Sequence, residues 1–270
     1  KNHNYGFDIA AIYNIVLKES DMNQKKKNMS SRRDFIVGSG LTAVGLSSFS
    51  QGKAMTASSN ALNLAENKRE ELISLLSDLI TIRSQTGESA EEAQALVNNY
   101  LSDLPYRIER SSDRPSLYQN HPEFMPPNPE SDGPFINIVG WPEKISRKTS
   151  AIFSHIDTHS EDAGWETDPY KPIIRKNRMY GLGTSDDKGG VAAMLIAAKI
   201  LSENDKPLPV VMSLHGKGGG SRGSLPVFER IRKQKHNIQS VLYAHPAETG
   251  RGLEVGKNAV LGVLDLGFGV

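Results

Sequence analysis

Four side chains in two short segments of this chain have the types and spacing that a metal site needs. The first segment is an apolar run that ends in His155 and Asp157. The second is a glycine-rich turn that carries Asp186 and Asp187 and leads into an alanine-rich stretch. Imidazole nitrogen and carboxylate oxygen are ligands that zinc accepts, and rigid elements hold such ligands in place. The two segments therefore predict a metal site at the ends of secondary-structure elements.

Helix capping is an alternative explanation for the acidic pair. An Asp at a helix N-terminus accepts hydrogen bonds from free backbone N–H groups and interacts favourably with the helix dipole. Capping would explain Asp186 or Asp187 by itself. It would not explain why His155 and Asp157 end an apolar run about 30 residues earlier. The metal hypothesis accounts for both segments.

The composition excludes several classes of protein and of site. With 270 residues the chain can form one large domain or two small ones, and its net charge of +1 gives no field that would attract nucleic acid. It has no Cys, which excludes disulfides and thiolate zinc sites and leaves His, Asp and Glu as ligands. It also has no uninterrupted apolar run of about 18 residues, so we expect no integral membrane span.

The chain begins with Lys1 rather than Met. Residues 1–21 show no pattern that connects them with the rest of the chain, and Met22 and Met29 are more natural starts. We therefore leave residues 1–21 unassigned and expect them to lie upstream of the true start.

Residues 22–57 have the order of features found in an export signal. A lysine-rich segment is followed by Arg32 and Arg33, a weakly apolar run and small residues. This order resembles a twin-arginine signal and predicts export to the periplasm or the exterior. A disordered basic tail is the alternative, but it does not explain the order.

Apolar periodicity predicts helices that alternate with strands over most of the remaining chain. We expect helices at 66–82, 88–104, 191–201 and 225–235, strands at 135–140, 149–154, 208–214, 240–244 and 259–270, a hairpin at 173–180 and a surface loop at 111–134. This alternation indicates an α/β fold with a mostly parallel sheet and helices on both faces. Ligands of such sheets bind at the carboxyl ends of strands. His155, His215 and His245 each follow a predicted strand.

The segments around His155 and Asp186 resemble the zinc aminoacylase family, which includes acetylornithine deacetylase, succinyl-diaminopimelate desuccinylase and carboxypeptidase G. The similarity extends over residues 72–270. It implies a zinc-exopeptidase-like catalytic domain, incomplete here, at 62–258. It also implies that 259–270 is the first strand of a truncated lid and dimerisation domain.

The resemblance assigns a role to each residue of the two segments. It makes His155 a zinc ligand and Asp157 a catalytic residue whose carboxylate orients the imidazole. Asp186 becomes the carboxylate that bridges two zinc ions in typical members. Zinc is therefore the expected cofactor, with cobalt as an alternative ion.

The Glu-Glu motif of the family is altered in this chain. Lys217 and Gly218 stand where the family has a general-base Glu and then a Glu ligand. A Lys takes a proton from water only if burial or a metal lowers its pKa, and Gly has no ligand atom. His215, two residues before Lys217, could supply a base or a ligand. Both His215 and Lys217 are therefore candidates for the catalytic role.

The Glu-Pro motif of the family is altered as well. His245 takes the position of the Glu ligand, and imidazole is an acceptable zinc ligand. Glu248 is an alternative if the turn shifts. The last His ligand of the family is expected downstream of Val270. The changes predict one zinc site rather than two, held by His155, Asp186 and His245.

These residues indicate a zinc-dependent hydrolase. It would cleave an amide or peptide bond of a small carboxylate-bearing substrate, such as a small peptide or an N-acyl amino acid, with metal-activated water. The alternative is an impaired or truncated relative that binds metal or ligand without turnover, as the changes at Lys217 and Gly218 suggest. A homodimer is expected only where the lid domain is present.

A nucleotide site would need a different pattern. The glycines at 216–220 do not form a P-loop, because Lys217 is followed by Gly218 rather than by Ser or Thr. The glycines at 181 and 183 lack the third glycine of a dinucleotide fingerprint. The sequence therefore does not favour nucleotide binding.

Overall fold

A five-stranded sheet forms the centre of the fold in the computed structural model, which describes residues 6–8, 59–85, 87–122, 135–145, 149–176, 178–213, 221–234, 236 and 238–244. Its strands are β2 (Tyr106–Asp113), β3 (Phe135–Pro142), β4 (Thr149–His155), β7 (Val210–Ser213) and β8 (Ile238–Tyr243), in the order β2-β3-β7-β4-β8. Strand β4 is parallel to β7 and to β8, whereas β2 with β3 and β3 with β7 are antiparallel. The predicted α/β class is confirmed, but the sheet is mixed rather than mostly parallel. The consecutive strands β2 and β3 pair directly, which antiparallel strands can do without a crossover helix.

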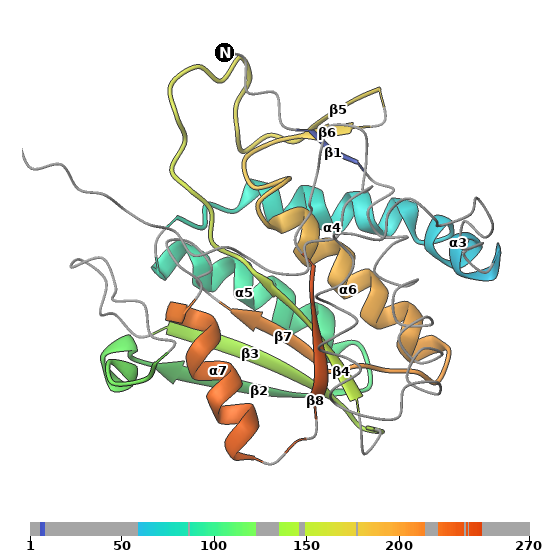
Figure 1. The fold of residues 1–270 in the computed structure, drawn as a ribbon. Helices are drawn as coiled ribbons and strands as arrows, with labels where there is room; N and C mark the ends of the chain where they lie inside the picture. The colour runs from blue at the N-terminus through green and yellow to red at the C-terminus, as the bar shows by residue number, and fades with distance from the viewer. Residues whose placement is uncertain are drawn as a thin grey trace, which may run out of the picture.

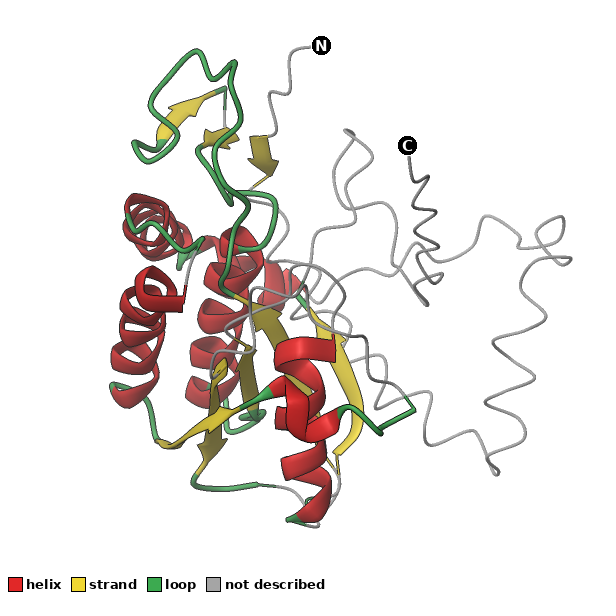
Figure 2. Ribbon diagram, turned by 90° about the vertical axis from the view of Figure 1, so that its left-hand side faces the viewer, coloured by secondary structure: helices red, strands yellow, loops and turns green. Residues whose placement is uncertain are grey.

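Helices cover both faces of this sheet, as predicted (Figures 1 and 2). They are α3 (Ser59–Glu66), α4 (Arg69–Thr81), α5 (Gly87–Ser102), α6 (Lys188–Glu203) and α7 (Ser221–Lys233), with a short 3-10 helix, η1 (Pro115–Tyr118). Successive residues of β4 show the two faces. Ile152 belongs to the core that α4, α5 and α6 share, whereas Phe153 packs on Phe228 of α7, with ring centroids 5.4 Å apart.

The apolar patterns of α4 and α6 explain where these helices pack. In α4, Leu72, Leu76 and Leu79 are buried at a spacing that places them on one side of the helix. Helix α6 is buried almost all round, because nearly all of its residues up to Leu201 are apolar. Its alanines let it approach β4 and α4 closely, and it therefore forms the centre of the larger core.

The structure differs from the sequence prediction in two elements. The helix expected at 66–82 is present as α4 from Arg69, but α3 (Ser59–Glu66), which precedes it with a break at Asn67, was missed by the sequence prediction. Asn side chains compete for backbone hydrogen bonds and favour such breaks. The loop expected at 111–134 begins inside β2, a strand that the sequence prediction missed. Only Tyr106 and Ile108 supply apolar inward positions in β2, so its period-two pattern is weak.

A separate small sheet lies beyond the ends of the central strands (Figure 1). It contains β1 (Gly6–Asp8), β6 (Arg178–Tyr180) and β5 (Ile173–Arg175), in the order β1-β6-β5. The antiparallel pairing of β5 with β6 confirms the predicted hairpin. Strand β1 comes from the stretch that the sequence left unassigned. The rest of 1–21, the predicted signal at 22–57 and the predicted strand at 259–270 lie outside the described residues.

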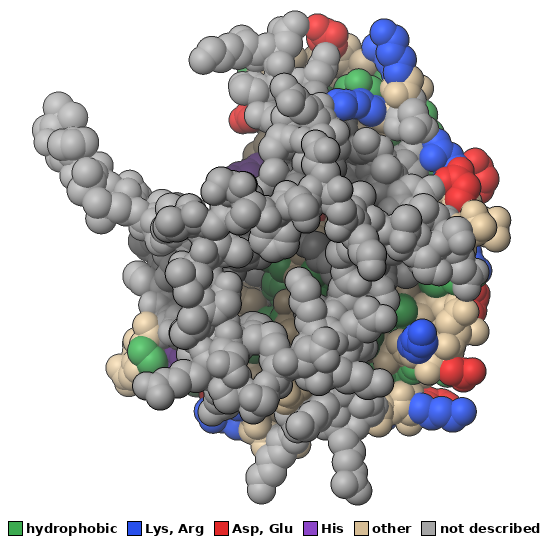
Figure 3. All heavy atoms as spheres, turned by 45° about the vertical axis from the view of Figure 1, so that its right-hand side comes forward, with side chains coloured by type: hydrophobic (Ala, Val, Ile, Leu, Met, Phe, Trp, Pro, Cys, Tyr) green, Lys and Arg blue, Asp and Glu red, His purple; other side chains and the backbone are tan. Residues whose placement is uncertain are grey.

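The described surface carries both signs of charge. Acidic and basic side chains are interspersed along one side of the face in Figure 3, in agreement with the net charge of +1. Within the described ranges, no helix is long and apolar enough to cross a membrane.

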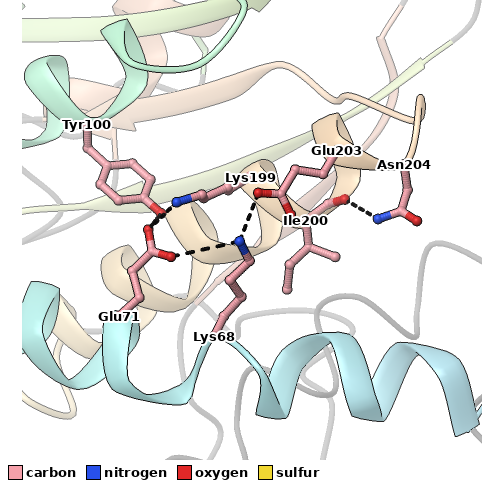
Figure 4. A network of polar contacts seen from close by, with 7 residues as sticks. All are labelled: Lys68, Glu71, Tyr100, Lys199, Ile200, Glu203 and Asn204. Carbon is pink, nitrogen blue, oxygen red and sulfur yellow. Dashed lines mark hydrogen bonds and ion pairs between the residues drawn. The ribbon is translucent and has the colours of Figure 1, made fainter.

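A polar network joins α4, α5 and α6 (Figure 4). Glu71 accepts a hydrogen bond from the Tyr100 hydroxyl at 2.8 Å and one from Lys199 Nζ at 2.6 Å. Lys68 Nζ lies 2.8 Å from Glu203 Oε1 and 4.0 Å from Glu71 Oε2. Burial acts to raise the pKa of Glu71, but the hydrogen bonds from Lys199 and Tyr100 and the nearby lysine charges outweigh it and lower that pKa. The carboxylate of Glu71 therefore stabilises the packing of these three helices.

We expect Glu71→Gln to lower the free energy of unfolding at neutral pH by about 1–2 kcal/mol, because it removes charge from two hydrogen bonds. Since the folded-state pKa of Glu71 is below its ordinary value of 4.5, its contribution is present above that value and is lost as pH falls through the lower folded-state pKa. Urea unfolding at a series of acidic pH values should therefore show that the free energy of unfolding decreases less with falling pH in Glu71→Gln than in the wild type. The exposed Glu70 on the same helix gives the control Glu70→Gln. Equal stability of the two variants would contradict this role.

Candidate metal centre

His155 ends β4 with its imidazole between two carboxylates. Its Nδ1 lies 3.0 Å from Asp157 Oδ1 and its Nε2 lies 3.2 Å from Asp186 Oδ1. The side chain of His155 is 6% exposed and that of Asp157 is 1% exposed, whereas that of Asp186 is 55% exposed. The structure thus brings together three residues that the sequence predicted for one site, with Asp157 on the buried side and Asp186 on the solvent side.

The buried carboxylate sets the orientation of the imidazole. Asp157 has an oxygen at hydrogen-bond distance from Nδ1, so the tautomer with a proton on Nδ1 leaves the Nε2 lone pair directed at Asp186. A carboxylate in this position commonly fixes the ring of a metal-binding His. This geometry supports the role predicted for Asp157.

The distance between the two outer atoms allows a test of the predicted metal. Zinc binds His nitrogen and carboxylate oxygen at about 2.0–2.2 Å, so two such ligands on one tetrahedral ion lie about 3.4 Å apart. The Nε2–Oδ1 distance of 3.2 Å fits this value. Among the described residues, however, no group of three or more His, Cys, Asp or Glu side chains could hold a metal ion. His155 and Asp186 therefore fit as two ligands of one ion, and a third must come from elsewhere.

The remaining predicted site residues lie outside the described part of the chain. His245 as third ligand, with Glu248 as its alternative, and His215 and Lys217 as base candidates therefore stay predictions. The strands that precede them are described. Register pairs His155 with Ser213 and Phe153 with Tyr243, so β4, β7 and β8 end at the same edge of the sheet.

The negative surroundings of His155 favour a cation at this site. Burial alone would lower the pKa of the imidazole, but the hydrogen bonds to Asp157 and Asp186 and the charges of Asp187 and Asp157 raise it to about 10. The same carboxylates that favour a proton on the ring favour a metal cation beside it, and the two compete for Nε2.

The first turn of α6 fixes the acidic pair. Asp187 occupies the N-cap position and its carbonyl accepts a hydrogen bond from Val191 N at 2.8 Å, but its side chain makes no capping hydrogen bond. The buried carboxylate of Asp187 instead accepts a hydrogen bond from the Ser154 hydroxyl. The peptide bond between Asp186 and Asp187 is cis. Capping by the side chain, the alternative raised from the sequence, therefore does not explain this residue.

The turn between α4 and α5 connects the two ligand-bearing segments. Ser84 O accepts a hydrogen bond from Thr158 N at 3.1 Å, and Ile82 O accepts one from the buried Lys188 Nζ at 2.6 Å. Burial lowers the pKa of Lys188 to about 8. The guanidinium of Arg83 lies 4.0 Å above the ring of Tyr170 in the loop after Asp157. This turn thus contacts the segments of both Asp157 and Asp186.

Glycines bring the backbone segments of the site close together. A Cβ on Gly190 would lie 1.7 Å from Ala244 O and 2.1 Å from Asp187 Oδ1, so the end of β8 lies directly against the first turn of α6. Gly183 has a φ of +85°, and a Cβ there would lie 2.6 Å from Thr158 Cγ2. Both positions require glycine.

Two neighbours of the site were missed by the sequence prediction. Ser154 binds Asp187, and Tyr243 lies beside His155 with ring centroids 6.2 Å apart. Side chains alternate along β4, so Ser154 points to the face opposite that of His155, and its contact with Asp187 has no signal in the sequence. No sequence signal shows that β8 lies next to β4, so nothing indicated Tyr243.

Comparison with known proteins gives a family match over the part of the chain that carries His155 and Asp186. Residues 151–261 match the model of peptidase family M20/M25/M40. The matched residues include His155, Asp157 and Asp186. The M20 match confirms, at the level of family, the resemblance that the segments around His155 and Asp186 indicated.

The chain is similar to curated relatives over part of their length. It is 30% identical over 178 residues to the N-formyl-4-amino-5-aminomethyl-2-methylpyrimidine deformylase of Bacillus subtilis (strain 168), covering 61% of this chain and 37% of the relative. It is 24% identical over 198 residues to the succinyl-diaminopimelate desuccinylase of Sulfurovum sp. (strain NBC37-1), covering 72% and 48%. The chain thus spans less than half of each relative.

Solved structures share the fold. The di-peptidase Dug1p from Saccharomyces cerevisiae superposes with a TM-score of 0.51 at 18% identity, covering 68% of this chain and 40% of that structure. At this identity the likeness concerns the fold alone, and it agrees with the α/β architecture.

We expect Gly190→Ala to lower the free energy of unfolding by about 3 kcal/mol or more, because the added methyl group meets backbone and a buried carboxylate that cannot move aside. The matched control is Gly140→Ala, whose Cβ would lie 3.2 Å from the side chains of Leu101 and Tyr106. Small shifts of those side chains should limit its cost to about 1 kcal/mol. Denaturant unfolding measures both, and equal losses would show that β8 does not lie against α6 in this way.

Proposed function

We propose that this M20 domain belongs to a metal-dependent hydrolase that cleaves an amide or peptide bond of a small carboxylate-bearing substrate. The observation that carries the proposal is the buried His155, held by Asp157 and directed at Asp186. The family match and the names of the two curated relatives, which describe removal of a formyl and a succinyl group, support this chemistry.

We assign the metal ligands from the geometry and the sequence together. His155 and Asp186 would hold one zinc, or cobalt in its place, and Asp157 would keep the imidazole in the required tautomer. His245 is the proposed third ligand, and its candidacy is supported by the contact between Ala244 O and Gly190 beside Asp187. Bound zinc would polarise the scissile carbonyl and lower the pKa of water.

The residue that takes a proton from water is proposed from the sequence and from the position of β7. His215 and Lys217 are the candidates, since both come after β7, whose end is paired with His155 through Ser213. Export by the twin-arginine-like segment at 22–57 is a separate proposal, supported by the order of its features.

We expect His155→Ala to abolish tight zinc binding by the full chain and any zinc-dependent hydrolysis of N-acyl amino acids or dipeptides. Asp157→Asn should weaken zinc binding about 10- to 100-fold, because the ring loses the carboxylate that orients it. Calorimetric titration and product assays measure the two effects. The exposed His159, four residues further on, provides the control His159→Ala, which should behave as wild type.

Two outcomes would contradict parts of this proposal. Zinc binding that survives His155→Ala would place the metal elsewhere. Tight binding without hydrolysis, also in a version extended to the length of the relatives, would favour a non-catalytic metal-binding relative.

A further inference from the structure

We propose that Tyr243 forms an aromatic wall beside the metal centre and selects substrates that carry an aromatic or heteroaromatic ring close to the scissile amide. This inference rests on the proposed function, because it concerns the substrate of the same site. It is carried by the position of Tyr243, its exposure and the side chains that hold its ring.

The register of the sheet places Tyr243 next to the proposed ligand. Tyr243 pairs with Phe153 across β4 and β8, so both side chains lie on the face of the sheet that α7 covers. The Tyr243 ring centroid lies 5.1 Å from that of Phe153 and 6.2 Å from that of His155. The phenol ring is therefore a direct neighbour of the imidazole.

Exposure distinguishes Tyr243 from the rings beneath it. Phe153 is 8% exposed and His155 is nearly buried, whereas Tyr243 is 42% exposed. Phe153 in turn packs on Phe228, with ring centroids 5.4 Å apart. The Tyr243 ring thus rests on a fixed aromatic layer and leaves part of its surface accessible beside the site.

The ring is the part of Tyr243 that neighbouring side chains hold beside the site. A ring held on two sides has little conformational freedom to lose when a ligand binds. Contacts between aromatic rings add attraction beyond the area that they bury. A flat unsaturated ring is therefore the group that this wall favours.

The test uses two carboxylate probes that each carry one six-membered ring and differ in whether that ring is flat. Benzoate and cyclohexanecarboxylate both carry an oxygen ligand, but only benzoate is flat. Calorimetry on the zinc-loaded full chain gives the ratio of their dissociation constants. Comparing this ratio between variants cancels the intrinsic difference between the probes.

We expect the preference for benzoate over cyclohexanecarboxylate, measured as the ratio of their dissociation constants, to be about three- to ten-fold larger in the wild-type chain than in Tyr243→Leu. Tyr243→Phe keeps the ring and should keep the wild-type ratio. Val241→Ala, equally exposed on the same strand but paired with Ala151, should keep it too. Unchanged thermal melting shows that the variants fold, and Tyr243→Met replaces Tyr243→Leu if the latter does not.

The same ratio in Tyr243→Leu and wild type would overturn the proposal, as would a loss of preference in Tyr243→Phe, which would assign the effect to the hydroxyl. Absence of binding by both probes would also overturn it. Because binding is measured without turnover, a chain that shows the preference but hydrolyses no amide would contradict the proposed function while still showing that Tyr243 selects flat rings.

Discussion

The hydrogen bond between the buried imidazole of His155 and the buried carboxylate of Asp157 is the interaction on which the site depends. A charged group in a low-dielectric interior is costly unless it is paired and hydrogen-bonded. Asp157 is almost completely buried, so its charge needs the imidazole as a partner. Once that pair has formed, the remaining ring nitrogen is directed toward solvent and Asp186. The requirement to pair a buried charge thus also orients a ligand.

The rest of the fold keeps this pair in place. Strand β4 lies between β7 and β8, pairing with β8 as far as Phe153 and with β7 as far as His155. Helix α6 is buried almost all round, and Asp186 and Asp187 directly precede its first residue, where Ser154 of β4 binds Asp187. The contacts of Ile82 and Ser84 with Lys188 and Thr158 add a third support. The site is therefore held by the most buried elements of the chain.

The buried elements that carry the site could be predicted from the sequence, because they have strong patterns. The apolar runs of β4 and α6 exceed what a surface element could carry, and both proved buried. Strand β2 was missed since alternating polar residues in Tyr106–Asp113 hide its inward positions. The order of strands was not predictable, because pairing of β8 with β4 depends on contacts between distant residues. For the same reason the sequence indicated His155 and Asp186 but not their neighbour Tyr243.

The central claim is that His155 and Asp186 bind one metal ion. Anomalous scattering at the zinc edge from crystals of the zinc-loaded chain tests it most directly. We predict one strong peak at about 2.0–2.2 Å from both His155 Nε2 and an Asp186 carboxylate oxygen, with Asp157 still hydrogen-bonded to Nδ1. A peak bound to other residues, or none within bonding distance of Nε2, would contradict it.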